Sequence, residues 1–108
     1  MEQLKIQERR GVNYSLLELS GVLDSYNFTD FQQKAYALIK DNNLVIDLSN
    51  LASIDSSGIS TIFGSITLGQ EFGRTLYIMN PSPEARKALS STGFMDTFNI
   101  IFSVTEVI

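Results

Sequence analysis

The chain has 108 residues, 44% of them hydrophobic and 19% charged, which fits one globular domain, residues 1–108, built around one core. Its 12 acidic and 8 basic residues give a net charge of -4, and this charge opposes the attraction that drives binding to nucleic acids and anionic membranes. Because cysteine and histidine are absent from the sequence, disulfides, thiolate nucleophiles, Ser-His-Asp triads and the usual zinc sites are excluded.

The first ten residues are mixed polar and charged. They do not resemble a signal peptide, and no later apolar run is long enough to cross a bilayer. We therefore expect a cytoplasmic protein.

The first half of the chain predicts a hairpin followed by a helix. Apolar residues at strand spacing over residues 4–8 and 14–19 predict an opening β-hairpin. Over residues 28–42 the apolar side chains fall within about 100° of arc, which predicts an amphipathic helix. We expect Thr29 to cap this helix and Tyr36, on its polar side, to be exposed.

The second half alternates between strands and helices. The predicted order is a strand over 44–48, a helix over about 59–72 ended by Gly73, a strand over 75–79, a helix from Pro83 to Leu89 and a strand over 98–104. Such alternation is typical of right-handed βαβ crossovers. The fold class we predict is therefore α/β, with a mainly parallel β-sheet, an N-terminal hairpin and helices from the crossovers.

The helix predicted over residues 59–72 has an unusual polar side. On a helical wheel its buried stripe consists of Ile59, Ile62, Phe63 and Ile66. The opposite side gathers Ser57, Ser60, Thr61, Gly64, Leu68 and Glu71, and residues 59–70 carry no charge. Because an ordinary solvated helix face is charged, we interpret this small, uncharged side as a surface for another protein. We expect Gly64 to lie on it, so that Gly64→Arg would spare the fold and block the partner.

Two short motifs close neighbouring strands. Gly21-Val-Leu-Asp24 ends the second strand, and Asp55-Ser56-Ser57-Gly58 joins a strand to a helix. Function tends to lie at such junctions, and a helix N-terminus favours an anion. Two plainer interpretations stay open: any of residues 55–57 is an N-cap, and Asp24 is a turn residue.

Both motifs resemble signatures of the STAS domain family, specifically the bacterial anti-sigma factor antagonists. Their signatures are Gly-x-Leu-Asp after the second strand and Asp-Ser-Ser/Thr-Gly-Leu/Ile at the second helix, and both are present here in order. The resemblance extends through Met79-Asn-Pro-Ser-Pro83 and Ser91-Thr-Gly-Phe94, and so covers nearly the whole chain. One departure is that residues 105–108 allow about one turn where the family usually has a C-terminal helix.

The resemblance implies a phosphorylation switch. In that family the serine after the aspartate, which falls on Ser56, is phosphorylated by a partner that is both anti-sigma factor and serine kinase, and a serine phosphatase restores the unmodified form. Asp24 falls on the kinase-binding loop. The partner-binding residues we expect are Asp24, Asp55, Ser57, Gly58, Ser60, Thr61, Gly64 and Leu68. We expect Ser56 rather than Ser57 to be modified, because Ser57 would use its hydroxyl as a cap.

Two other kinds of function compete with this one. The alternative is a STAS module that binds a small ligand or acts as a scaffold without phosphorylation, which fold resemblance alone does not exclude. An enzyme would have to use Asp24, Asp47 or Asp55 with a metal, and no Asp-x-Asp spacing supports one. We therefore expect no enzymatic activity, catalytic residue, metal, cofactor, nucleic acid or membrane partner.

Overall fold

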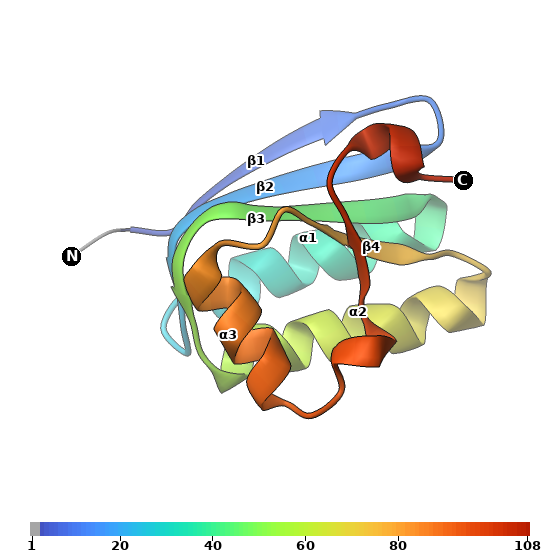
Figure 1. The fold of residues 1–108 in the computed structure, drawn as a ribbon. Coiled ribbons are helices and arrows are strands. Elements are labelled where there is room, and N and C mark those ends of the chain that lie inside the picture. Colours follow the sequence, from blue (N-terminus) through green and yellow to red (C-terminus); the bar gives the residue numbers. More distant parts are fainter. Residues whose placement is uncertain (1–2) are drawn as a thin grey trace.

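The structure is a computed structural model that describes residues 3–108, so the first two residues of the predicted domain lie outside the described part. Five strands, three α-helices and two 3-10 turns follow one another along the chain (Figure 1). Their bounds are β1 Lys5–Arg10, β2 Tyr14–Leu23, α1 Phe28–Asp41, β3 Asn43–Ile54, α2 Ser56–Phe72, β4 Leu76–Met79, α3 Pro83–Ser91, η1 Met95–Thr97, β5 Asn99–Ile101 and η2 Val104–Glu106.

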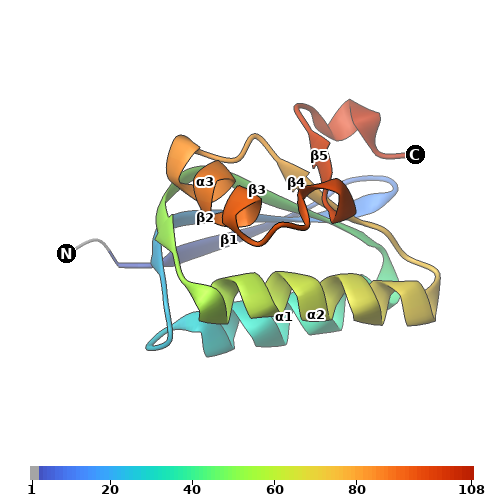
Figure 2. The same cartoon turned by 60° about the horizontal axis from the view of Figure 1, so that its bottom comes forward.

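The five strands form one mixed sheet in the order β1-β2-β3-β4-β5. β1 and β2 pair antiparallel as a hairpin, and the three remaining neighbouring pairs are parallel. Because the parallel strands are added in sequence order and crossovers are right-handed, all the crossover helices fall on one face. α1 and α2 accordingly run side by side along that face of the sheet (Figure 2). The predicted α/β fold is confirmed.

Each face of the sheet has its own apolar cluster. On the helix side, residues such as Leu17, Ile46 and Ile78 pack with α1, α2 and α3. On the other side, Leu16, Val45, Tyr77, Met79 and Ile101 pack with Val107 of the C-terminal segment. Neighbouring residues such as Leu16 and Leu17 separate because successive strand side chains point to opposite faces. The predicted burial of residues 44–48 on both faces is confirmed for Val45 and Ile46.

Several predicted boundaries differ from the structure. β3 continues to Ile54, because its second half stays paired with β2 through two shifts of register. α2 begins at Ser56 instead of residue 59. β5 stops at Ile101, because the Ser103 side chain and Glu106 form a capping box that starts a 3-10 turn.

The helix ends follow local chemistry. Gly73 ends α2 in the left-handed conformation with φ 68°, as predicted. Thr29 is not the N-cap of α1. Asn27 occupies that position, and its side chain binds the preceding loop instead of the helix. Tyr36 is half-buried against the helix-side core, so the prediction that it is exposed was wrong.

Candidate functional site

The two motifs meet at one edge of the sheet, as predicted. The backbone N–H of Asp55 donates to the Leu23 carbonyl at 3.1 Å, which joins the ends of β3 and β2. Two residues after Leu23, in the β2–α1 loop, the N–H of Ser25 donates to Asp55 Oδ2 at 3.1 Å. The loop therefore lies against the start of α2, at the same end of the molecule in both views (Figures 1 and 2).

Asp55 is the N-cap of α2. Its backbone is extended, and its Oδ1 accepts hydrogen bonds from the N–H groups of Ser57 at 2.9 Å and Gly58 at 3.4 Å. These bonds satisfy N–H groups that have no partner within a helix. One carboxylate thus caps α2 with one oxygen and holds the β2–α1 loop with the other.

Ser56 is the first residue of α2 and is exposed to solvent. An anion at this position interacts favourably with the positive end of the helix dipole. The expectation that Ser57 caps the helix with its hydroxyl was wrong. Ser57 is half-buried and offers Asp55 its backbone N–H, while its carbonyl accepts the hydroxyl of Thr61 at 3.0 Å.

Asp24 shapes the β2–α1 loop. Its Oδ1 accepts the Tyr26 N–H at 2.9 Å, and its carbonyl accepts the N–H groups of Asn27 at 3.2 Å and Phe28 at 3.0 Å. The Asn27 side chain closes the loop from within by accepting from the Asp24 N–H and donating to the Val22 carbonyl. The turn role left open for Asp24 is thus present in the structure, and its partner-binding role stays a prediction.

The first residue of the Gly-x-Leu-Asp motif, Gly21, occupies a position that only glycine fits. Its φ is +91°, and a Cβ there would lie 2.1 Å from the Gln3 carbonyl oxygen. Both the conformation and the close approach require glycine. The register of β2 against β3 shifts between Gly21 and Val22, just before the loop that carries Asp24.

Several residues predicted on the smooth side of α2 are covered by the domain itself. Thr61 is fully buried. A Cβ on Gly64 would lie 2.0 Å from the Tyr36 hydroxyl of α1. Leu68 is half-buried against the helix-side core. The prediction that these three residues form an exposed face was wrong, because α2 packs against α1 as well as the sheet and its small residues allow that close approach.

Gly58 is also a packing residue. It is buried, and a Cβ at this position would lie 2.6 Å from Ile54 Cγ1 and 2.7 Å from Leu23 Cδ2. Of the predicted buried stripe, Ile62 is fully buried. Ile59, Phe63 and Ile66 are only partly buried. The outer side of α2 is instead formed by exposed Ser56, Ser60, Thr67, Gln70 and Glu71.

Sequence reasoning missed Tyr26 of the β2–α1 loop. Its side chain is 95% exposed although it lies beside two hydrogen-bonded loop residues. The sequence does contain a signal, an aromatic residue two positions after the aspartate of Gly21-Val-Leu-Asp24. The sequence does not show that the Tyr26 side chain is exposed.

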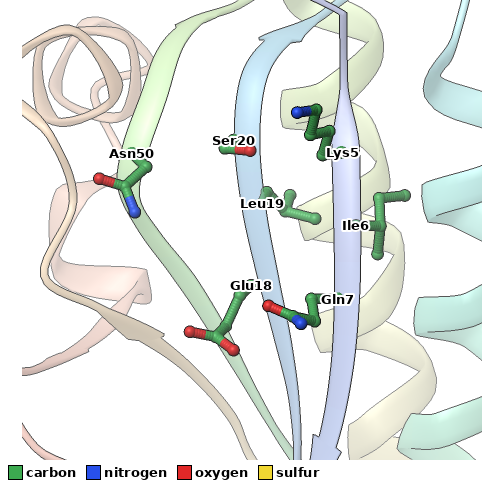
Figure 3. A pocket seen from close by; sticks show the side chains of 7 residues that line it. All are labelled: Lys5, Ile6, Gln7, Glu18, Leu19, Ser20 and Asn50. Atoms are coloured by element: carbon green, nitrogen blue, oxygen red, sulfur yellow. The ribbon is translucent and has the colours of Figure 1, made fainter.

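A separate polar hollow lies on the sheet face away from α1 and α2. It has a volume of about 350 Å³ and is lined by Lys5, Ile6, Gln7, Glu18, Leu19, Ser20 and Asn50 (Figure 3). Glu18 forms an ion pair with Arg9 of β1, and the side chains of Ile6 and Leu19 belong to the core on the helix side. The floor of the hollow is thus the open surface of β1, β2 and β3.

Among residues 3–108, no cluster of acidic side chains has the arrangement of a metal site. Within the same range no helix is long and apolar enough to span a bilayer.

Comparisons with known proteins agree with this fold. Solved structures of similar fold include an anti-sigma factor antagonist from Mycobacterium paratuberculosis, with 22% identity, TM-score 0.82 and coverage of 96% of this chain and 90% of the other. A putative anti-sigma factor antagonist from Thermotoga maritima has 18% identity, TM-score 0.83 and coverage of 94% and 89%. The Bacillus protein SpoIIAA in its phosphorylated form has 20% identity, TM-score 0.73 and coverage of 94% and 95%.

No curated protein sequence matches the chain significantly. The family model described as "STAS domain" matches residues 3–107. The matched range includes both loop motifs and every strand and helix of the described fold. The chain therefore belongs to the STAS domain family.

Proposed function

We propose that the chain is a non-enzymatic anti-sigma factor antagonist of the cytoplasm. In its unmodified form it binds an anti-sigma factor with serine kinase activity and thereby frees the sigma factor. Phosphorylation of Ser56 by that kinase ends the interaction, and a serine phosphatase restores it. The contact surface includes the β2–α1 loop that Asp24 shapes, the turn formed by Asp55, Ser56 and Ser57, and Ser60 on the first turns of α2.

The observation that carries this proposal is the position of Ser56. The residue is exposed at the first position of α2, and its neighbour Asp55 ties that position to the β2–α1 loop. A kinase that binds both segments would therefore have the serine within the contact surface. Ser57 is half-buried behind it.

The relatives support the same direction. The similar structures include proteins described as anti-sigma factor antagonists, and one of them was determined in a phosphorylated form. Their identity to this chain lies between 18% and 22%. At this identity the structures support the shared fold, and the proposed partner and modification rest on the motif residues of this chain.

The free chain should tolerate the phosphate. An anion at the start of a helix gains about 0.3–1 kcal/mol at an exposed position, and Ser56 occupies such a position. Phosphorylation should thus leave the fold intact. Its effect falls on the complex.

The added charge is large enough to act as the switch. A phosphoserine carries about -1.5 to -2 charges at neutral pH. At an effective dielectric constant near 20, two like unit charges roughly 6 to 8 Å apart repel by about 2 to 3 kcal/mol. Two such pairs with acidic groups of the kinase approach the ~5.5 kcal/mol that reverses a 99:1 equilibrium.

Phosphate mapping tests the modification. Each anti-sigma factor kinase encoded in the same genome is purified and incubated with the chain and ATP, and the modified residue is identified by mass spectrometry. We expect a single phosphate on Ser56 and none on Ser56→Ala. Thr67→Ala, which alters an exposed hydroxyl residue three turns further along α2 and outside this surface, is the matched control and should be modified like the wild type. Phosphate found on Ser57 alone would contradict the assignment.

The hollow of Figure 3 favours the second candidate, a STAS module that binds a small polar ligand. Its volume of about 350 Å³ is within the range of small-molecule sites, about 300–1,000 Å³. Thermal denaturation in the presence of nucleotides and other polar metabolites tests this candidate, since a ligand of the native state raises Tm. A rise that Asn50→Ala abolishes would support it, and no shift with any compound would argue against it.

A further inference from the structure

We propose that Tyr26 is the anchor by which the chain holds its anti-sigma partner, and that Asp24 acts as a positioning residue for Tyr26. This inference rests on the proposed function and names the contact residue of the same surface. The partner site that fits Tyr26 is an uncharged apolar cleft for the ring with a polar group at its rim for the phenol hydroxyl.

The first observation is exposure without a structural role. The Tyr26 side chain is 95% exposed, so it contributes almost nothing to the core of the domain. A single exposed aromatic residue is common on protein surfaces and does not by itself mark an interface. The proposal therefore depends on where the loop holds this side chain.

The second observation is that the loop is held in place. The Tyr26 N–H is bound by Asp24 Oδ1 at 2.9 Å. The Ser25 N–H is bound by Asp55 Oδ2 at 3.1 Å, and the Asn27 side chain bridges the Asp24 N–H and the Val22 carbonyl. A ring presented by a fixed backbone loses less conformational entropy on binding, because the backbone is already ordered.

The third observation is the position beside Ser56. Tyr26 follows Ser25 and Ser56 follows Asp55, and Ser25 and Asp55 are joined by a hydrogen bond. Of the other large exposed apolar side chains among residues 3–108, Phe94 packs against Phe63 of α2 with 6.1 Å between the ring centroids, and Phe102 follows the edge strand β5. Phe72 ends α2, about 24 Å from Ser56 at 1.5 Å per residue. Val12 and Ile108 lie where the β1–β2 turn meets the C-terminal segment, joined by the hydrogen bond from Asn13 to the Val107 carbonyl.

These observations give Tyr26 the properties of an interface hot spot. Tyrosine is enriched among the few residues that supply most of the binding energy. Such residues work by burying a large ring in a pocket of the partner. The partner's pocket would then lie next to its active site, because the substrate serine is beside the anchor.

Asp24 has a different role in this arrangement. Its Oδ1 is already used by the Tyr26 N–H. Asparagine at this position retains an oxygen acceptor for that bond and loses only the charge. If Asp24 positions the loop, Asp24→Asn should behave like the wild type and Asp24→Ala should not. If Asp24 contacts a basic group of the partner, both variants should lose affinity.

The test measures the Kd of each variant for the purified anti-sigma factor kinase that the wild-type chain binds, together with its Tm. We expect Tyr26→Ala to weaken binding at least about 30-fold, the change that about 2 kcal/mol produces, with no change in Tm. Tyr26→Phe should stay within about threefold of the wild type if the ring is the anchor. Val12→Ala, another fully exposed position, is the control and should bind normally.

The outcomes separate this inference from the proposed function. If Tyr26→Ala binds within about twofold of the wild type while Ser56→Asp loses binding, the anchor is overturned and the switch stands. If Asp24→Asn loses as much affinity as Asp24→Ala, the positioning role is overturned. If the wild-type chain binds none of the kinases, the proposed function fails and the anchor fails with it.

Discussion

The Asp55 carboxylate accepts a hydrogen bond from the backbone N–H of Ser25 at 3.1 Å while its other oxygen caps α2. One side chain therefore holds together two segments that are 30 residues apart in the sequence. The position of Ser56 relative to the β2–α1 loop depends on this carboxylate.

Asp55→Ala should destabilise the domain. Loss of an N-cap costs about 0.5–2 kcal/mol, and the lost bond to Ser25 adds about 0.5–1.5 kcal/mol. Thermal denaturation should show a Tm lower by roughly 4–8 °C for each kcal/mol. Asp55→Asn, which retains oxygen and removes charge, should lose less. Equal stability of Asp55→Ala and the wild type would mean that the cap contributes nothing.

Gly64→Arg should lower the stability of the domain. A Cβ at Gly64 would lie 2.0 Å from the Tyr36 hydroxyl oxygen, and such overpacking costs about 1–3 kcal/mol. Thr67→Arg changes an exposed residue of the same helix and should leave Tm nearly unchanged. Because Gly64→Arg alters α1–α2 packing, a loss of partner binding in this variant would not locate the interface.

Gly64→Ala and Tyr36→Phe should be non-additive. Phenylalanine lacks the hydroxyl that the new Cβ approaches. The double variant should therefore be more stable than the two single changes in the free energy of unfolding, added together, would predict. A chemical denaturation series of the four proteins measures the coupling. Strict additivity would show that Gly64 and Tyr36 do not share a contact.

The sequence predicts those parts of the fold and of the candidate site that hydrophobic periodicity reports. Element order and the parallel sheet could be predicted because apolar periodicity reports one buried face per element. α2 breaks that assumption, since it packs on the sheet and on α1 at once. The residues of α2 that contact α1 are small and not strongly apolar. The helical wheel therefore places Thr61 and Gly64 on the outer side of the helix. The role of the Asp24 carboxylate in the loop and the exposure of the Tyr26 side chain depend on hydrogen bonds within the loop. Hydrophobic periodicity does not report such bonds.

Gly21→Ala should destabilise the domain more than Gly93→Ala. Both glycines have positive φ, +91° and +78°. A Cβ on Gly21 would clash with the Gln3 carbonyl, whereas a Cβ on Gly93 meets nothing within 4 Å. Positive φ costs about 1 kcal/mol in both cases, so the difference in free energy of unfolding isolates the clash. Equal losses would show that the N-terminal segment moves away freely.

Ser56→Asp should bind the partner poorly and yet be at least as stable as the wild type. Aspartate in the first turn of a helix interacts favourably with the dipole, by about 0.3–1 kcal/mol. The variant separates a binding defect from a folding defect, since both Tm and Kd are measured on one protein. A variant with a lower Tm than the wild type would contradict the placement of Ser56 at the helix start.

The most direct test of the switch compares one preparation before and after stoichiometric phosphorylation at Ser56. Its Kd for the anti-sigma factor kinase is measured by calorimetry, with nucleotide conditions held constant. The account predicts that the phosphorylated chain binds at least about 100-fold more weakly, as a repulsion of about 2.7 kcal/mol would produce, and that phosphatase treatment restores the original Kd. Equal affinity of the two forms, with phosphate verified on Ser56, would contradict it.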